Sequence, residues 1–193
     1  MEVAVHFETQ STKSSVKFRK SRGYAMQPRK REKWSVVDYQ SKLMDGVVQL
    51  ILSIQNIEAG LDISLDEQPD LLDIQSNYQK RGGGFWVAIN EQSQVIGSIG
   101  LQRETETVSV LKKFFVKDGY RGSEVGVAVA LFDRLVAFSD LRGIKTIILD
   151  TPSRATRSHA FYRKMGFRQI SKSEAPIKYD YPDRDSLLFR LDR

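Results

Sequence analysis

The sequence predicts a mixed α/β (α+β) fold, in which a sheet of about seven strands carries helices on both faces. Three observations lead to this class. Strand and helix patterns alternate along the chain, a hairpin lies between two helical regions, and a later strand is rich in β-branched residues. The resulting order is β-α-α-β-β-β-α-β-α-β-β, which favours a mixed sheet covered on both sides.

The first part of the domain begins near Trp34, where aromatic and β-branched residues predict a short strand over 34–39. Apolar residues then recur at spacings of three and four over 43–57, which predicts a helix of about four turns. Gly60 is a suitable end for it. Pro69 opens a second, shorter helix.

The central part contains the clearest strand signals. Residues 85–89 and 95–101 are strand-like segments joined by a turn, and they predict a hairpin. The segment 107–116 predicts the next strand. Downstream, the pattern predicts helices over 123–141 and 155–165 and a buried strand over 146–150. It also predicts a final strand pair over 167–170 and 186–191.

Composition excludes several classes of protein. The 193 residues are 40% hydrophobic and 28% charged, which is typical of a globular domain rather than a disordered chain. Cysteine is absent and there are only two histidines, so we expect no disulfide, no thiol catalysis and no metal. No apolar run approaches the ~20 residues that span a bilayer, and the start lacks a signal-peptide pattern. We therefore expect a cytoplasmic protein.

The net charge of +6 belongs to the N-terminal segment. Residues 1–33 contain nine Lys or Arg against three Glu, whereas 34–193 is neutral overall. We expect 1–33 to be a flexible basic extension and 34–193 to be one domain. A basic arm also has the charge to bind RNA or DNA, so a nucleic-acid partner stays open through this segment alone.

The junction from Phe114 to Gly126 is the first candidate site, because a strand passes through a tight turn into a helix start. Such a junction offers backbone N–H groups and the positive end of a helix dipole to an anion. Arg121 adds a charge-assisted contact, and Gly122 and Gly126 let the backbone approach a phosphate. A simple connection between elements has the same pattern, so both interpretations stay open here.

A second motif lies about 35 residues further on, where residues 161–167 read Phe-Tyr-Arg-Lys-Met-Gly-Phe. With this motif the sequence resembles the GNAT superfamily of acyl-CoA-dependent N-acetyltransferases. The family's phosphate loop, Arg/Gln-x-x-Gly-x-Gly/Ala, corresponds to residues 121–126, and its helix-end signature, Phe-Tyr-x-Lys-x-Gly-Phe, corresponds to 161–167. The resemblance covers 34–193 and implies a GNAT-like, largely antiparallel mixed sheet.

The resemblance also implies a reaction. Acetyl-CoA is the expected co-substrate, and a primary amine, expected to be a small molecule, attacks it directly in a ternary complex. The main chain at Phe115 and Val116 is expected to pair with pantetheine and to point an N–H at the thioester carbonyl. The diphosphate is expected on the loop formed by Arg121, Gly122, Ser123, Glu124, Val125 and Gly126.

Tyr162 is the candidate general acid. A tyrosine hydroxyl with a pKa of about 10 is protonated at neutral pH and is able to protonate a departing thiolate, whose pKa is about 8.5. The alternative is an aromatic residue that ends a helix and packs on the sheet.

The general base and the acceptor site have weaker signals. Glu104 lies in the turn before the central strand, where it is a candidate base or a solvated turn residue. Asp150 ends a buried strand and is a candidate for orienting the amine or for capping the next turn. Tyr179, in a late polar loop, is a candidate for lining the acceptor pocket.

The loop departs from the family pattern at Glu124, where the family has glycine. A carboxylate beside a diphosphate repels it, so this departure favours a non-catalytic domain that binds CoA or a partner. We expect instead that Glu124 turns outward, toward Lys117 or Arg121, and leaves the loop backbone to bind CoA. A protein N-acetyltransferase would carry the same motifs, and a homodimer is compatible with the sequence.

Overall fold

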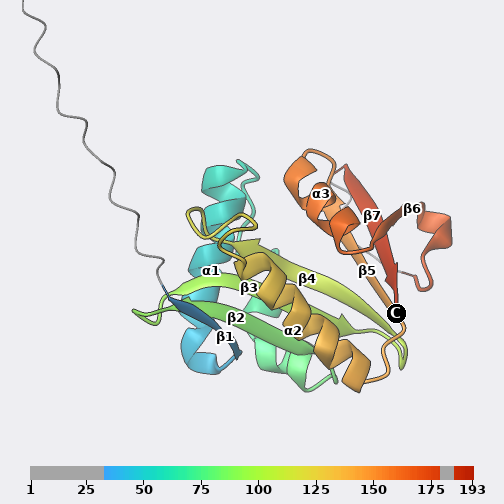
Figure 1. Cartoon of the computed structure of the whole chain (residues 1–193), viewed down its shortest axis with the longest axis horizontal. Helices are drawn as coiled ribbons and strands as arrows, with labels where there is room; N and C mark the ends of the chain where they lie inside the picture. Colours follow the sequence, from blue (N-terminus) through green and yellow to red (C-terminus); the bar gives the residue numbers. More distant parts are fainter. Residues whose placement is uncertain (1–32, 179–184) are drawn as a thin grey trace, which may run out of the picture. The chain divides into compact units, whose positions relative to one another are not determined.

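The computed structural model describes residues 33–178 and 185–193. The predicted basic extension lies outside the described residues except for Lys33, and so does Tyr179. Figure 1 shows the path of the described chain from the first strand to the C-terminus.

Seven strands form one sheet in the order β1-β2-β3-β4-β5-β7-β6. The strands are β1 (Trp34–Asp38), β2 (Gly84–Asn90), β3 (Val95–Arg103), β4 (Val108–Val116), β5 (Thr146–Pro152), β6 (Arg168–Ile170) and β7 (Ser186–Asp192). Neighbouring strands are antiparallel except β4 and β5, which are parallel. The predicted mixed, largely antiparallel sheet is confirmed.

Three α-helices and several short turns accompany the sheet. They are η1 (Ser41–Leu43), α1 (Met44–Leu52), η2 (Ser53–Glu58), η3 (Pro69–Leu71), η4 (Gln75–Gln79), α2 (Val127–Leu141), α3 (Thr156–Lys164) and η5 (Lys172–Glu174). The helix predicted over 43–57 is a 3₁₀ turn, α1 and the π-helical η2 in succession, and Gly60 follows it at φ +61°. The predicted second helix is reduced mainly to the short turns η3 and η4.

The start of α2 corrects the sequence prediction, which began that helix at Ser123. Gly126 has φ +80° and Gly122 has φ +104°, so the backbone makes two left-handed steps before α2 begins at Val127. Left-handed steps interrupt a right-handed helix, and glycine takes them without the cost of a Cβ. Residues 121–126 are therefore a loop with its own conformation.

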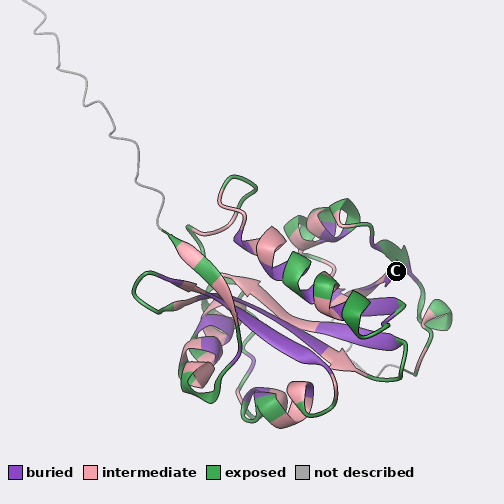
Figure 2. Ribbon diagram, turned by 60° about the horizontal axis from the view of Figure 1, so that its bottom comes forward, coloured by how far each residue is buried: buried purple, intermediate pink, exposed green. Residues whose placement is uncertain are grey.

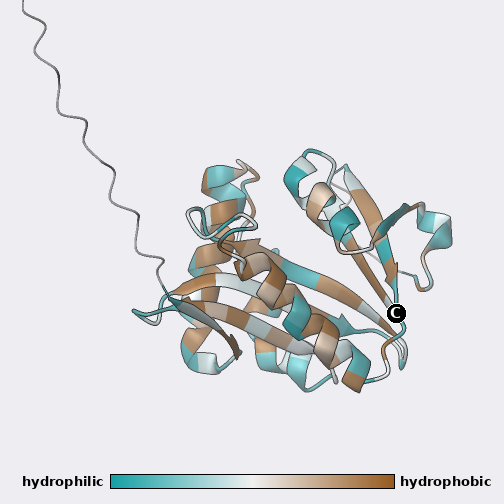
Figure 3. Ribbon diagram, viewed as in Figure 1, coloured by the Kyte–Doolittle hydropathy of each residue, from teal (hydrophilic) through white to brown (hydrophobic). Residues whose placement is uncertain are grey.

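Helices cover both faces of the sheet, as predicted. On one face, α2 and α3 pack on a cluster that includes Leu131, Leu135 and Phe167. On the other face, α1, η3 and η4 pack on a second cluster that includes Ile51, Leu71 and Tyr78. Figure 2 shows the middle of the sheet buried between these layers, and Figure 3 shows apolar residues concentrated there. Each fully buried aliphatic side chain contributes about 1.5–3 kcal/mol.

The described residues lack two features. No helix there combines the length and the apolar character that crossing a bilayer requires. Over the same ranges, no three His, Cys, Asp or Glu side chains come together in a group that would hold a metal ion.

Candidate active site

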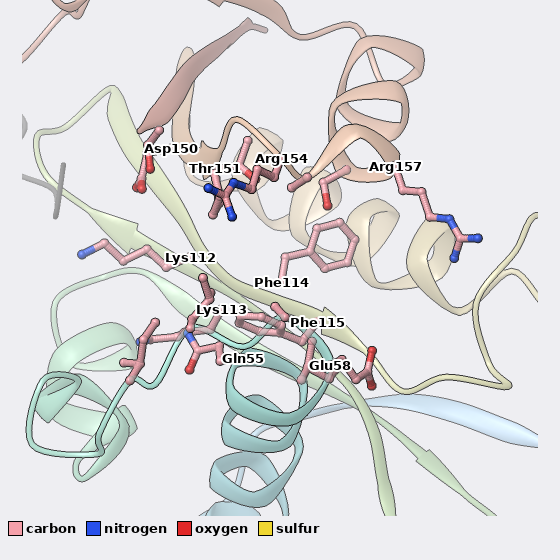
Figure 4. A pocket seen from close by; sticks show the side chains of 18 of the residues that line it. Gln55, Glu58, Lys112, Lys113, Phe114, Phe115, Asp150, Thr151, Arg154 and Arg157 are labelled. Carbon is pink, nitrogen blue, oxygen red and sulfur yellow. The ribbon is translucent and has the colours of Figure 1, made fainter. Parts of the chain in front are cut away.

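The site begins where β4 and β5 separate. The two strands pair over only three positions, from Val108 opposite Thr146 to Val110 opposite Ile148. Beyond Val110, β4 keeps β3 as its partner but has no partner on the β5 side. A pocket of about 790 Å³ lies along this unpaired edge, with walls from η2, the start of η3, the end of β5 and the start of α3. Figure 4 shows this pocket.

A β-bulge in β4 shapes the floor of the pocket. Ser98 on β3 pairs with Phe115 and Gly100 pairs with Lys112, so two β4 residues, Lys113 and Phe114, stand opposite one β3 residue. Lys113 has φ +53°, which is an uncommon conformation for a residue other than glycine. The Ser98 hydroxyl donates to the Lys113 carbonyl at 2.8 Å and fixes the bulge against β3.

The bulge directs two backbone N–H groups into the opening. The Lys113 carbonyl faces β3, so the N–H of Phe114, across the same trans peptide, faces the pocket. The Lys117 N–H donates to Ile96 of β3 at 2.8 Å, so the Val116 carbonyl, and with it the Val116 N–H, also faces the pocket. The sequence prediction named Phe115 and Val116. Both residues line the pocket, and so does Phe114, which the sequence prediction did not name. The main chain of Phe115 pairs with Ser98, so the N–H groups that face the pocket are those of Phe114 and Val116.

Tyr162 lies across the opening on α3, where it lines the pocket and is only 6% exposed. Its ring packs near Phe114, with 6.3 Å between the centroids. Burial, and secondarily the negative charge of Asp150, raise the pKa of the Tyr162 hydroxyl well above its usual range. The hydroxyl is therefore a proton donor, not a base, throughout the physiological pH range.

Arg121 is held at the edge of the same pocket. Its Nε donates to the Val116 carbonyl at 2.6 Å, and its Nη2 donates to the Glu58 carboxylate of η2 at 2.6 Å. Asp118 is a weaker partner at 3.9 Å. Arg121 therefore bridges the β4 edge and η2, beside the loop that leads to α2.

The rest of the loop lies beside the pocket rather than in its lining. Gly122, Ser123 and Glu124 are exposed, and Val125 and Gly126 are half-buried. Nothing lies within 4 Å of a Cβ built on Gly122. Within 33–178 and 185–193, no side chain caps α2, so none of these side chains occupies the N–H groups of its first turn.

Glu124 is exposed, as the expectation of an outward side chain requires. Its expected contact with Arg121 does not form, because that guanidinium contacts Glu58 and Asp118. Sequence reasoning missed Glu58 because 63 positions separate it from Arg121.

The weaker candidates separate into two groups. Asp150 lines the pocket at the end of β5, and its charge acts on both Tyr162 and Lys113. Glu104 is an exposed residue of the turn between β3 and β4 and is not part of the pocket lining. The structure thus brings Asp150, but not Glu104, together with Tyr162.

A buried polar network that the sequence did not reveal lies under the pocket. The Lys113 ammonium donates to Gln68 at 2.7 Å and pairs with Asp70 at 3.2 Å, and Tyr78 donates to Asp70 at 2.5 Å. Gln68 and Gln55 also exchange hydrogen bonds through their amides. Burial lowers the pKa of Lys113, and Asp70 opposes part of that effect.

Comparisons with known proteins agree with this geometry. A GNAT acetyltransferase domain model matches residues 81–169. An acetyltransferase from Streptococcus agalactiae has 40% identity and a TM-score of 0.80, over 83% of this chain and 98% of that one. A GNAT-family acetyltransferase from Staphylococcus aureus has 32% identity and a TM-score of 0.77, over 83% and 99%. The fold and site thus define an acetyltransferase, and the chain belongs to the GNAT family.

Other relatives share only part of their length or only the fold. N-acetylaspartate synthetase from Danio rerio is 34% identical over 107 residues, which are 54% of this chain and 37% of that protein. The chain therefore spans little more than a third of that relative. The PaiA N-acetyltransferase from Thermoplasma acidophilum, solved in complex with coenzyme A, has the same fold at 14% identity and a TM-score of 0.62, over 83% of this chain and 99% of that one.

Proposed function

We propose that this chain transfers the acetyl group of acetyl-CoA to the primary amine of a small molecule, by direct attack in a ternary complex. The observation that carries the proposal is the unpaired edge of β4, which presents the N–H groups of Phe114 and Val116 opposite the buried hydroxyl of Tyr162. These groups are the ones that acetyl transfer from a thioester requires.

The residues present fit acetyl-CoA. An extended pantetheine chain is able to pair with the open edge as an added strand does. The loop over 121–126 and the uncapped first turn of α2 offer N–H groups to a diphosphate, and Arg121 adds positive charge. Coenzyme A in a relative of the same fold supports this assignment.

The reaction assigns one role to each polar group. The amine nitrogen forms a bond to the thioester carbonyl carbon while the carbon–sulfur bond breaks. The N–H of Phe114 stabilises the negative charge that develops on the carbonyl oxygen. The ammonium first loses one proton to solvent and becomes a nucleophilic amine. Tyr162 then donates its proton to the departing sulfur, and the second proton, which the nitrogen loses after the new bond forms, returns to the Tyr162 oxygen. Asp150, whose charge reaches Tyr162, orients the ammonium before it loses its first proton.

The pocket favours a small acceptor. Its lining comes from several elements that surround the β4 edge, and its volume of about 790 Å³ lies within the range of small-molecule sites. The name of the Danio rerio relative, N-acetylaspartate synthetase, supports an amino acid as acceptor. The non-catalytic alternative rested on Glu124, whose side chain is exposed. Its exposure supports a carboxylate that turns into solvent and leaves the backbone N–H groups of the loop to the diphosphate.

Two measurements test the proposal. Thiol release from acetyl-CoA is measured across a panel of amines, amino acids, polyamines and peptides. Melting temperature is measured with and without CoA, because a ligand that binds only the folded state raises it. We expect a thermal shift with CoA and thiol release with at least one small amine. Release with peptides alone would favour the protein N-acetyltransferase, and a shift without release would favour the non-catalytic domain.

A further inference from the structure

The end of the pocket nearest the fork between β4 and β5 has a charge pattern that the acetyl-transfer chemistry does not use. Five cationic side chains line the whole pocket: Lys112, Lys113, Arg121, Arg154 and Arg157. Two of them are already neutralised, because Lys113 pairs with Asp70 and Arg121 pairs with Glu58. Among the described residues, Lys112 and Arg154 have neither an ion pair nor a hydrogen bond through their side chains.

The bulge explains why a lysine faces this end. Side chains alternate between faces along a strand, so Lys112 and Lys113 would ordinarily point in opposite directions. The bulge inserts one residue and shifts the alternation, so that Leu111 and Phe114 both pack on the α2 face. Lys112 and Lys113 are consequently both left on the face of the sheet where the pocket opens.

Strand register places Asp150 beside Lys112. Val110 pairs with Ile148, and each of the two charged residues lies two positions further along its own strand. They occupy equivalent positions on the same face, at the point where the strands part. Figure 4 shows Lys112, Asp150 and Arg154 at one end of the pocket, while Glu58 and Arg157 lie at the other.

This end also lies close to the reacting groups. Lys112 precedes Phe114 by two residues, which is about 7 Å along a strand. The charge of Asp150 reaches Tyr162. A molecule whose amine lies at Asp150 therefore has Lys112 and Arg154 at the same end of the pocket for its other groups.

We infer that the acceptor is an α-amino acid with two carboxylates, held by Lys112 and Arg154 at its carboxylates and by Asp150 at its ammonium. Lys112 and Arg154 match the charge of two carboxylates, and Asp150 matches the charge of the ammonium. The inference rests on the proposed function for the identity of the reaction, but the carboxylate site is defined independently of catalysis. Lys112 and Arg154 are specificity-determining residues in this account, because they contact the acceptor away from the bond that forms.

The buried network supports the same assignment. Lys113 is 12% exposed and is fixed by Gln68 and Asp70, so it holds the floor below Lys112 in one conformation. Because Asp70 pairs with Lys113, the Asp70 carboxylate does not compete with the acceptor for Lys112. A polycationic acceptor finds no such complement here, since Lys112 and Arg154 repel it.

The test is direct binding, measured by calorimetry in the presence of CoA. The probes are L-aspartate and L-aspartic diamide, which has similar size and the same amine but lacks both carboxylates. The proteins are the full chain, Lys112→Gln, Arg154→Gln, and the controls Lys145→Gln and Arg81→Gln, whose side chains are exposed outside the pocket lining. All four substitutions replace a cation with a neutral polar side chain, and the folding of each variant is checked by melting temperature.

We expect aspartate to bind more tightly than the diamide by at least tenfold. Lys112→Gln and Arg154→Gln should each weaken aspartate binding by about 10- to 100-fold, which corresponds to one charge-assisted hydrogen bond. The two controls should bind aspartate as the unaltered chain does. Equal binding of aspartate and the diamide would overturn the inference, and so would unchanged aspartate binding in Lys112→Gln and Arg154→Gln.

A kinetic measurement separates this inference from the proposed function. With aspartate as acceptor, Lys112→Gln should raise KM for aspartate and leave KM for acetyl-CoA unchanged. If aspartate binds through Lys112 but no thiol is released, the carboxylate site stands and the proposed acetyl transfer fails. If thiol is released with spermidine but not with aspartate, the acetyl transfer stands and the carboxylate site is wrong.

Discussion

The two halves of β4 belong to one strand and have opposite roles. Residues 108–110 are buried between β3 and β5, with hydrogen-bonding partners on both sides. Residues 112–116 are half-buried, with β3 as their only strand partner. The comparison teaches that one strand supplies both stability and a binding edge. Its second half keeps free the N–H groups that its first half uses in the sheet.

Loss of the Tyr162 hydroxyl should have the largest effect on the open half. Tyr162→Phe keeps the ring and its packing, and it removes only the proton donor. We expect kcat to fall by about 10²–10⁴-fold with little change in KM for acetyl-CoA. Steady-state kinetics by thiol release measure this. Unaltered turnover in the variant would make Tyr162 a packing residue only.

The closed half should instead control stability. Val110 is fully buried opposite Ile148, so Val110→Ala should lower the free energy of unfolding by about 2–3 kcal/mol. The matched change in the open half, Val116→Ala, should cost only about 1 kcal/mol because that side chain is half-buried. Urea denaturation of both variants gives the comparison. Equal losses would show that the two halves are not distinct.

Loss of the Glu58–Arg121 ion pair should have a smaller effect at the open half, and it should strengthen the binding of CoA. Its two side chains are 35% and 32% exposed, so the pair itself adds little stability. Glu58→Gln releases Arg121 for a diphosphate, and we expect CoA to bind about two- to fivefold more tightly in this variant. Calorimetry with CoA measures the change, with the exposed Glu91→Gln as control. Weaker binding in Glu58→Gln would assign the glutamate to CoA recognition.

The pH profile should show no effect of Tyr162 ionisation. Burial and Asp150 raise the pKa of Tyr162, so the acid keeps its proton above the pKa of about 10 of an ordinary tyrosine. We expect kcat to stay level from pH 8 to pH 10 wherever the protein remains folded. A fall over that range that is absent in Tyr162→Phe would contradict the assigned environment.

Most strands and the family motifs were predictable because their signals are local. Alternation and turn residues defined the hairpin of β2 and β3, and the Phe-Tyr-x-Lys-x-Gly-Phe motif defined Tyr162. The bulge in β4 was not predicted, since one inserted residue shifts the side-chain alternation without changing composition. The available signal was the stretch Leu-Lys-Lys-Phe-Phe, in which two lysines are adjacent. In a regular strand, two adjacent side chains point to opposite faces of the sheet.

Other features of the site depend on contacts that no local pattern contains. Arg121 meets Glu58 and Lys113 meets Asp70 across long separations in sequence. The start of α2 was misplaced because Gly126 was interpreted only as a close-approach residue, and its left-handed conformation was not considered. The site's charge pairing therefore follows from topology, while its motifs follow from sequence.

The central claim is that the unpaired half of β4 is the binding edge for acetyl-CoA. Amide hydrogen exchange, measured residue by residue with and without saturating CoA, tests it most directly. We predict that protection rises by at least tenfold at Phe114 and Val116 and stays unchanged at Val110, which is already paired. Unchanged exchange at Phe114 and Val116, under conditions in which CoA binds, would contradict the account.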